Sequence, residues 1–137
     1  LFIDDEKDFL EVMSERMTAR NMKVSTAASA KEGLTIAAEG SFDAVILDLA
    51  MPEMNGIEVL KILKEKNPDL EVILLTGHAT VKDGIEAMKL GALDLLEKPA
   101  DINALTEKIR AAQAKKMVIV EKKSEEMVKK IMATKGW

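Results

Sequence analysis

The chain has 137 residues, of which 47% are hydrophobic and 32% charged, a composition typical of one soluble globular domain or of one domain with an appendage. It contains no cysteine, which excludes disulfides and thiolate metal sites, and no apolar run long enough to span a bilayer. A net charge of −4 and an aromatic content of 3% argue against general nucleic-acid binding, and the lack of cysteine and of a signal-peptide pattern favours a cytoplasmic location.

Charge is distributed unevenly. Residues 1–100 carry a net charge of −8, and residues 101–137 carry +4. The basic segment is typical of a solvated, lysine-rich terminal helix, although a docking surface for an acidic partner would look the same. The chain begins inside a predicted strand without an initiator methionine, so we expect the native protein to start a few residues earlier.

Strands and helices alternate along the chain to about residue 112. The apolar residues 1–3 predict a strand, which leads into a helix whose apolar side chains recur at helical spacing, namely Leu10, Met13 and Met17. Residues 22–25 alternate between apolar and polar side chains and predict a short second strand. Ser29 is a suitable N-cap for the next helix, which we expect to end before Gly40.

The same pattern continues after Gly40. A third strand over 44–47 ends at Asp48, and the loop 49–56 leads into a helix that runs to about Lys66. A fourth strand over 72–75 ends at Thr76. The next helix carries apolar residues at helical spacing, namely Val81, Ile85 and Met88, and a short fifth strand at 95–96 precedes Lys98 and Pro99.

This alternation predicts a parallel sheet that is covered by helices on both faces. The first, third and fourth strands are nearly all apolar, as central strands are, whereas the second and fifth are short and mixed, as edge strands are. The strand order 2-1-3-4-5 of the flavodoxin-like, doubly wound α/β fold satisfies both conditions.

The last segment predicts a helix that extends beyond the sheet. It contains no Gly or Pro from Asp101 to about Thr134, and its first part can pack on the sheet through Ile102, Leu105 and Ile109. Beyond that, residues recur at steps of three and four, as in a coiled coil: Met117, Val120, Ser124, Met127 and Ile131. We therefore expect a globular domain over 1–112 and a helical extension over 113–137. An amphipathic tail folded back on its own domain is the alternative.

Three carboxylates follow two strands that this topology makes neighbours. Asp4 and Asp5 follow the first strand, and Asp48 ends the third, so all three meet at the carboxyl edge of the sheet. Clustered acids repel one another unless a cation lies among them, and Mg²⁺ prefers such oxygen ligands. We expect Asp5 and Asp48 to bind Mg²⁺ directly, Asp4 directly or through water, and the backbone carbonyl of Ala50 to complete the protein ligands.

Two further residues at the same edge suit phosphoryl chemistry. A carboxylate such as Asp48 can attack phosphorus and form an aspartyl phosphate. Lys98, after the fifth strand, can pair with a phosphoryl oxygen, and Thr76, at the end of the fourth, can donate its hydroxyl to another. Each residue alone is more often a cap, a turn residue or a solvated side chain. Their occurrence together at successive strand ends indicates a site.

With these residues in place, the segment from residue 1 to about residue 112 resembles the receiver domains of two-component response regulators. The resemblance rests on four segments, which are 4–6, 48–56, 76–79 and 91–99. It implies that Asp48 is the phosphoacceptor, that Asp4 and Asp5 bind Mg²⁺, that Thr76 is the switch hydroxyl, and that Lys98 contacts the phosphate. It also implies a cis peptide bond before Pro99 and a histidine kinase as phosphodonor.

The chain departs from this family at one position. Many receivers have Tyr or Phe three residues before the lysine, where the ring turns inward as the threonine moves, and here that residue is Leu95. The usual coupling between threonine and aromatic ring is therefore in question. His78 lies two residues after Thr76, where the family suggests that it and Ala50 flank the phosphoryl group and influence water access. A solvent-exposed loop histidine is the alternative.

The leading hypothesis is a bacterial, cytoplasmic phosphorelay protein that accepts a phosphoryl group and then switches a partner-binding or self-binding surface. Its partners would be a histidine kinase or phosphotransfer protein and an output partner. A homodimer could form through the C-terminal helix or through the face made by the fourth helix, fifth strand and fifth helix. A receiver-like interaction module that works without phosphorylation is the alternative.

We expect the chain to act as an enzyme only on its own phosphorylation and dephosphorylation. Haloacid-dehalogenase-like phosphatases, which form an aspartyl-phosphate intermediate, normally carry a second acid two residues after the nucleophile as general acid/base, and here that residue is Ala50. A dinucleotide-binding fold is disfavoured because the first strand-to-helix turn contains no glycine.

Overall fold

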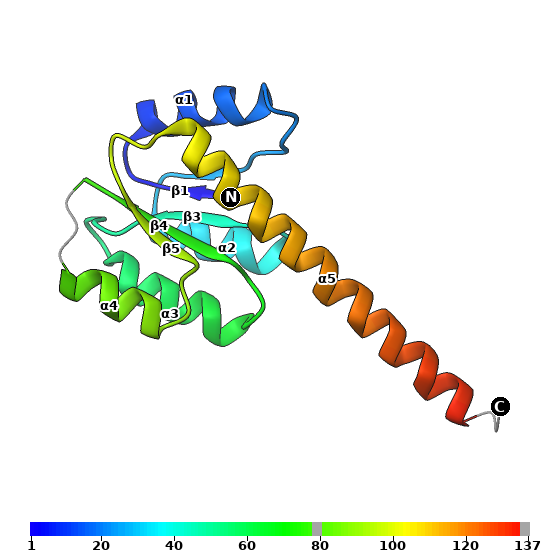
Figure 1. Ribbon diagram of the computed structural model, residues 1–137. Helices are drawn as coiled ribbons and strands as arrows, with labels where there is room; N and C mark the ends of the chain where they lie inside the picture. Colours follow the sequence, from blue (N-terminus) through cyan, green and yellow to red (C-terminus); the bar gives the residue numbers. More distant parts are fainter. Residues whose placement is uncertain (78–80, 135–137) are drawn as a thin grey trace.

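A computed structural model describes residues 1–77 and 81–134 of the chain. Five parallel strands form one sheet in the order β2-β1-β3-β4-β5 (Figure 1). In chain order the strands are β1 (Phe2–Ile3), β2 (Thr26–Ala27), β3 (Val45–Asp48), β4 (Val72–Thr76) and β5 (Asp94–Glu97). The flavodoxin-like order expected from the apolar pattern of the strands is confirmed.

Five helices cover the two faces of the sheet. They are α1 (Lys7–Thr18), α2 (Ala30–Glu39), α3 (Gly56–Lys66), α4 (Val81–Lys89) and α5 (Ile102–Thr134). Helices α1 and α5 lie on one face, and α2, α3 and α4 lie on the other (Figure 1). The predicted cap of α2 is confirmed, since the Ser29 hydroxyl accepts a hydrogen bond from the Glu32 backbone N–H.

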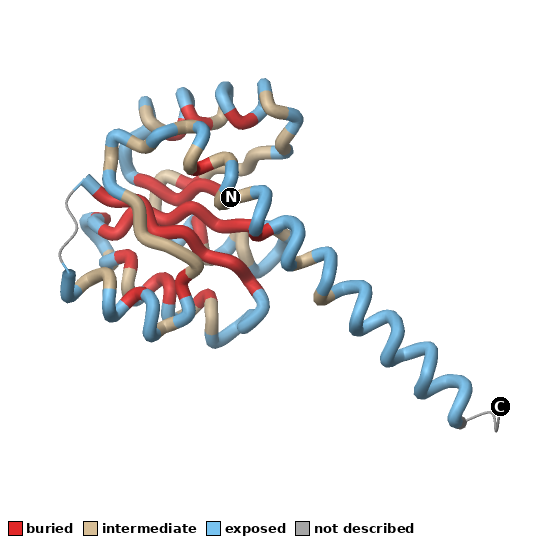
Figure 2. Tube along the Cα trace, viewed as in Figure 1, coloured by how far each residue is buried: buried red, intermediate tan, exposed pale blue. Residues whose placement is uncertain are grey.

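The core consists of two apolar layers separated by the sheet. Successive residues of a strand point to opposite faces. Accordingly, Val45 and Leu47 pack in the cluster beneath α2, α3 and α4, whereas Ile46 packs in the cluster beneath α1 and α5. The central strands are buried along their whole length (Figure 2). This burial explains why they are almost entirely apolar and why the polar residues that end them are confined to the sheet edge.

The prediction for the second strand was wrong by several residues. We expected residues 22–25, but β2 comprises Thr26 and Ala27, which pair with Phe2 and Ile3. The Phe2 backbone N–H donates to the Ser25 carbonyl. The segment after α1 therefore pairs with the two-residue strand β1 only from Ser25 onward, which places β2 later than predicted. The apolar side chains of Met22 and Val24 pack instead against the cluster beneath α1 and α5.

Helix α4 turns its large apolar side chains outward. Val81 is 82% exposed, and Ile85 and Met88 are each 52% exposed. The residue that α4 buries is Ala87, and a Cβ atom at Gly84 would lie 3.7 Å from the Leu95 side chain. The apolar spacing thus predicted the helix correctly but does not mark its buried face, because small residues make the close contact with β5.

Helix α5 is continuous and projects from the body (Figures 1 and 2). Its first part is anchored by Leu105 and Ala112, which are fully buried, whereas residues 121–133 are all exposed. The predicted extension of the helix past the body is confirmed, and the helix does not fold back on the domain as in the alternative. Among the described helices, none is long and apolar enough to cross a membrane.

Candidate functional site

Four polar side chains gather where the strands end. Asp4 follows β1, Asp48 ends β3, Thr76 ends β4 and Lys98 follows β5. Strands β1 and β3 are hydrogen-bonded neighbours, with Ile3 opposite Leu47, so the acids that follow them adjoin. The fold therefore places residues from four distant parts of the sequence at one edge, beside the point where the strand order reverses.

An acidic cluster lies at this edge. Carboxylate oxygens of Asp4, Glu6 and Asp48 all lie within 4.8 Å of one another, which is close enough for a single metal ion to bind all three. Asp4 is 2% exposed and Asp48 is 5% exposed, whereas Glu6 is exposed. Hard divalent cations such as Mg²⁺ take oxygen ligands of this kind.

Asp5 does not belong to this cluster. It is exposed, although its charge acts on Asp48 from nearby. The structure thus brings together Asp4 and Asp48 as expected, and adds Glu6 as the third acid. Glu6 could have been found in the sequence, because it directly follows Asp4 and Asp5 and still precedes the first helical residue, Lys7.

Lys98 reaches into the acidic cluster. Its Nζ atom lies 2.7 Å from Asp4 Oδ2, 3.5 Å from Glu6 Oε1 and 3.9 Å from Asp48 Oδ2. The ring of Phe9, on α1, lies 4.3 Å from the same ammonium group. Burial alone would lower the pKa of Lys98, but the hydrogen bond and charge of Asp4, together with the charges of Asp48 and Glu6, raise it. Lys98 is therefore the resident cation of the site.

Asp48 is a carboxylate in an unfavourable setting for its charge. Its pKa is raised to about 6, principally by burial and further by the neighbouring Asp4 and Asp5. A hydrogen bond from the Ala50 backbone N–H to Asp48 Oδ1, at 3.2 Å, and the charge of Lys98 oppose this rise. Added positive charge at this edge would therefore favour the ionised, nucleophilic form.

The loop between β3 and α3 is packed closely against Asp48. A Cβ atom on Gly56 would lie 2.6 Å from both the Asp48 carbonyl oxygen and the Leu49 Cα atom, so this position accepts only glycine without displacement. The Gly56 N–H donates to the Leu49 carbonyl at 2.6 Å, and the Asn55 side chain caps α3. These contacts hold Ala50, whose backbone carbonyl was expected to bind metal, immediately beside the acid.

Thr76 and Lys98 are joined through their backbones. The Lys98 N–H donates to the Thr76 carbonyl at 2.6 Å, and the Thr76 side chain is buried. The peptide bond between Lys98 and Pro99 is cis, as expected. Leu95 lies on β5, partly buried on the α4 side of the sheet. His78 lies outside the described residues, so its predicted position beside the phosphoryl group stays a prediction.

Comparison with known proteins agrees with this architecture. The profile of the response regulator receiver domain matches residues 1–110. The photosynthetic apparatus regulatory protein RegA of Cereibacter sphaeroides is 35% identical over 111 residues, which are 81% of this chain and 60% of RegA. The chain therefore corresponds to somewhat less than two thirds of that relative's length.

Solved structures give the same result. The crystal structure of a response regulator receiver domain protein from Clostridium thermocellum is 37% identical, covers 86% of this chain and 95% of its own, and has a TM-score of 0.82. That of the response regulator TrrA from Thermotoga maritima, in complex with Mg²⁺ and BeF, is 28% identical, covers 81% and 95%, and has a TM-score of 0.74.

The α/β fold and the acidic pocket beside a partly buried lysine together define a receiver domain. This chain belongs to the response regulator receiver domain family of two-component signalling systems.

Proposed function

We propose that this protein is a phosphorylation-controlled switch in which Asp48 accepts a phosphoryl group from a histidine kinase or phosphotransfer protein. The observation that carries the proposal is the convergence of Asp4, Glu6 and Lys98 on the buried carboxylate of Asp48. This arrangement has a nucleophile, a site for a divalent cation and a resident ammonium group within a few ångströms, which is what phosphoryl transfer to a carboxylate requires.

The metal would be Mg²⁺, held by Asp48, by the acids after β1 and by the backbone carbonyl of Ala50. Asp5 and Asp4 are the predicted ligands from the first of these loops, and Glu6 joins them as a candidate because its carboxylate already faces Asp4 and Asp48. When bound, Mg²⁺ supplies the positive charge that phosphoryl oxygens need during transfer.

The transfer itself needs little from the protein beyond positioning. An oxygen of Asp48 attacks phosphorus, a new P–O bond forms, and the bond from phosphorus to the donor breaks with its electron pair leaving on the donor. Lys98 would then exchange part of its contact with Asp4 for a phosphoryl oxygen, since its Nζ is within 3.9 Å of Asp48. The Thr76 hydroxyl would donate to another phosphoryl oxygen.

The phosphoryl group would favour a second arrangement of the face formed by α4, β5 and α5. Thr76 ends β4 and Lys98 directly follows β5, so a movement at either residue acts on that face directly. Leu95 lacks the ring that usually occupies a space opened by the threonine, so we propose repacking of Leu95 against α4 instead. The exposed Val81, Ile85 and Met88 would form part of the surface that changes.

The proposed division is a receiver over 1–112 and a helical extension over 113–137, in a cytoplasmic protein. The relatives in the comparison are longer, so the output of the whole protein and its partners remain part of the proposal. Leu95 is the one observation that favours the second candidate, an interaction module that works without phosphorylation.

The test is incubation of the purified chain with a small-molecule phosphodonor and Mg²⁺, followed by intact-mass measurement. We expect one phosphoryl group on the native chain, none on Asp48→Asn, and none on either protein when a chelator removes the metal. Asp8→Asn, which removes an exposed acid on α1, should be labelled like the native chain. Equal labelling of the native chain and Asp48→Asn would overturn the assignment, and no labelling of any protein would favour the interaction module.

A further inference from the structure

The projecting part of α5 carries an apolar stripe that its own body leaves uncovered. Four members of the predicted coiled-coil seam are between 48% and 66% exposed: Met117, Val120, Met127 and Ile131. They are large hydrophobic side chains on a helix whose residues 121–133 are all exposed (Figure 2). A contiguous exposed stripe of this kind marks an interaction surface.

Ion pairs set the rotation of this helix. Three lysines of α5 bind acids that precede β3 and β4: Lys115 with Glu71 at 3.0 Å, Lys116 with Asp43 at 3.6 Å and Lys123 with Asp69 at 2.9 Å. Glu71 is buried, so its pair with Lys115 anchors the base of the helix. Lys116 and Lys123 precede Val120 and Met127 by four residues, so the flank of α5 that contacts the body lies directly beside the apolar stripe and leaves the stripe itself exposed.

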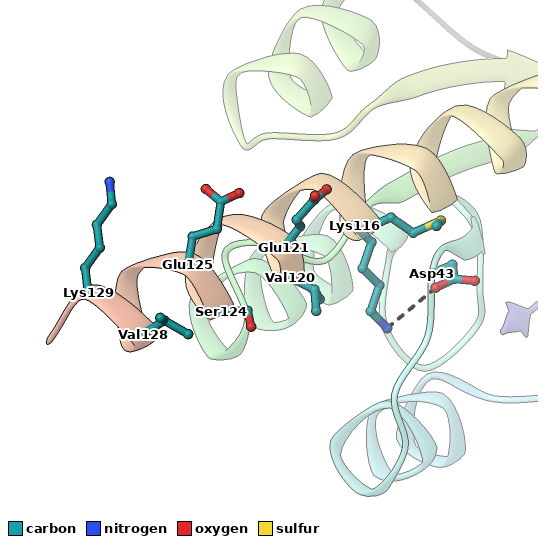
Figure 3. A pocket seen from close by; sticks show the side chains of 9 residues that line it. Asp43, Lys116, Val120, Glu121, Ser124, Glu125, Val128 and Lys129 are labelled. Carbon is teal, nitrogen blue, oxygen red and sulfur yellow. Dashed lines mark ion pairs between the residues drawn. The ribbon is translucent and has the colours of Figure 1, made fainter. Parts of the chain in front are cut away.

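An open groove of about 800 Å³ begins at Asp43, passes Met117, Val120 and Ser124 of the seam, and ends beside Val128. In Figure 3, Val120, Ser124 and Val128 point to one side of α5, and Glu121, Glu125 and Lys129 point to the other. Lys116 and Asp43 close the end nearest the body. The groove is therefore long, apolar along its floor and charged along its margin, which is the shape that accepts another amphipathic helix.

The spacing of the stripe identifies the occupant as a helix with the same repeat. Steps of three and four residues keep a seam in contact only with a partner helix whose seam repeats in the same way. The α5 helix of a second copy has that repeat because its sequence is identical. We propose that the extensions of two copies pair in parallel and in register, with Ser124 of each copy at the centre of the seam.

Charge selects the parallel arrangement. Three seam residues that are seven positions apart, Met117, Ser124 and Ile131, are each preceded by a lysine. These lysines are Lys116, Lys123 and Lys130. In an antiparallel pair these lysines would face one another across the seam. In a parallel pair Lys116 lies beside Glu121 of the second copy, and the stem of Lys123 covers Val128 of the second copy. In this arrangement the flank of α5 that contacts the body in one copy, which carries Lys116 and Lys123, adjoins the opposite flank of α5 in the other copy, which carries Glu121 and Val128.

This inference rests on α5 and does not depend on the proposed phosphorylation of Asp48. A polar residue at the centre of so short a seam reduces stability while it fixes the register. Dimerisation should consequently be reversible and sensitive to changes at Ser124. Replacing it with leucine buries an additional apolar side chain from each copy and should lower the dissociation constant at least about tenfold.

The test is analytical ultracentrifugation of the whole chain over a range of concentrations. We expect a monomer–dimer equilibrium for the native chain, a tighter dimer for Ser124→Leu and a monomer for Val120→Lys. Val118→Lys is the matched control, because Val118 is similarly exposed on the same helix but lies outside the seam. A monomer at every concentration for both the native chain and Ser124→Leu, or equal disruption by the two lysine substitutions, would overturn the proposal.

Orientation is tested by disulfide cross-linking, for which the chain is suited because it has no cysteine. Met117→Cys and Ile131→Cys proteins are mixed and oxidised. A parallel dimer gives cross-links within each variant, between like positions. An antiparallel dimer centred on Ser124 brings Met117 of one copy to Ile131 of the other, and a predominance of mixed cross-links would overturn the parallel arrangement. Asp48→Asn should behave like the native chain in all of these measurements.

Discussion

The Lys98 ammonium group lies 2.7 Å from Asp4 and 3.9 Å from Asp48, so its principal partner is not the proposed phosphoacceptor. Asp4 holds the lysine in place and leaves the reactive carboxylate with a weaker, longer contact. This arrangement provides positive charge beside Asp48 without tying up the oxygen that would attack phosphorus. A phosphoryl oxygen on Asp48 could also compete with Asp4 for the Lys98 ammonium group. Because Lys98 directly follows β5, this competition would transmit the presence of the phosphoryl group to that strand.

Removal of the lysine should therefore have two effects. In Lys98→Met, Asp4 remains buried without its ion pair, and we expect the free energy of unfolding to fall by about 1–3 kcal/mol in the absence of metal. Phosphorylation of Asp48 should also be slower. Chemical denaturation and the rate of labelling by a small phosphodonor measure these effects. Lys82→Met, on the exposed side of α4, is the control, and an unfolding curve like the control's would contradict this role for Lys98.

Stability should depend on pH through Asp48. Its pKa is about 6 in the folded chain, against an ordinary value of 3.8, so the folded state binds more protons than the unfolded state between these values. The contribution of Asp48 to the free energy of unfolding therefore falls as pH rises from about 4 to 6 and stays low above that range.

Asp48→Asn isolates this effect because asparagine does not titrate. In metal-free buffer the variant should be more stable than the native chain by about 1–3 kcal/mol at pH 7, and the difference should disappear near pH 4. Denaturant titrations across this pH range provide the measurement. A difference that is constant with pH would show that the pKa of Asp48 is not raised.

Metal binding should distinguish Glu6 from Asp5. A ligand that binds only the folded state stabilises it, by about 2.7 kcal/mol at a hundred times its dissociation constant. Mg²⁺ should thus raise the melting temperature of the native chain but have little effect on Asp4→Asn or Asp48→Asn. Comparison of Asp5→Asn with Glu6→Gln then identifies the remaining acid, since only loss of a true ligand weakens the response. If all four variants respond like the native chain, Mg²⁺ does not bind at this edge.

Gly56 should be intolerant of even one added carbon. In Gly56→Ala the new Cβ meets backbone atoms of Asp48 and Leu49, which cannot move without shifting the site loop. We expect a loss of about 1–3 kcal/mol in the free energy of unfolding, together with slower phosphorylation. Gly84→Ala is the opposite case, because the helix has room for the methyl group and should gain about 0.5–1 kcal/mol. Equal effects of the two substitutions would contradict the close packing at Gly56.

Much of the fold could be predicted because the central strands are buried on both faces. Continuous apolar runs identify β3 and β4, and they end at Asp48 and Thr76 because the sheet edge is the first place where polar side chains reach solvent or one another. The doubly wound strand order, in which β1 and β3 are neighbours, then brings Asp4 beside Asp48. These features depend on local pattern and topology, both of which are present in the sequence.

Other features depend on contacts that pattern does not specify. The bounds of β2 follow from where β1 offers hydrogen-bonding partners, and the buried face of α4 is formed by the small residues Ala87, which is buried, and Gly84, which lies beside Leu95 of β5. The inclusion of Glu6 in the acidic cluster depends on how the chain turns between Asp4 and α1, where the Glu6 N–H donates to the Asp4 carboxylate at 2.9 Å. Such details require coordinates.

The central claim, that Asp48 is the phosphoacceptor, is tested most directly by locating the phosphoryl group on the chain. Reduction of an aspartyl phosphate with borohydride converts that aspartate to homoserine, which peptide mass spectrometry can place at a single residue. After treatment with phosphodonor and Mg²⁺, we expect homoserine at position 48 and unmodified aspartate at positions 4 and 5. Homoserine at another acid, with Asp48 unchanged, would contradict the account.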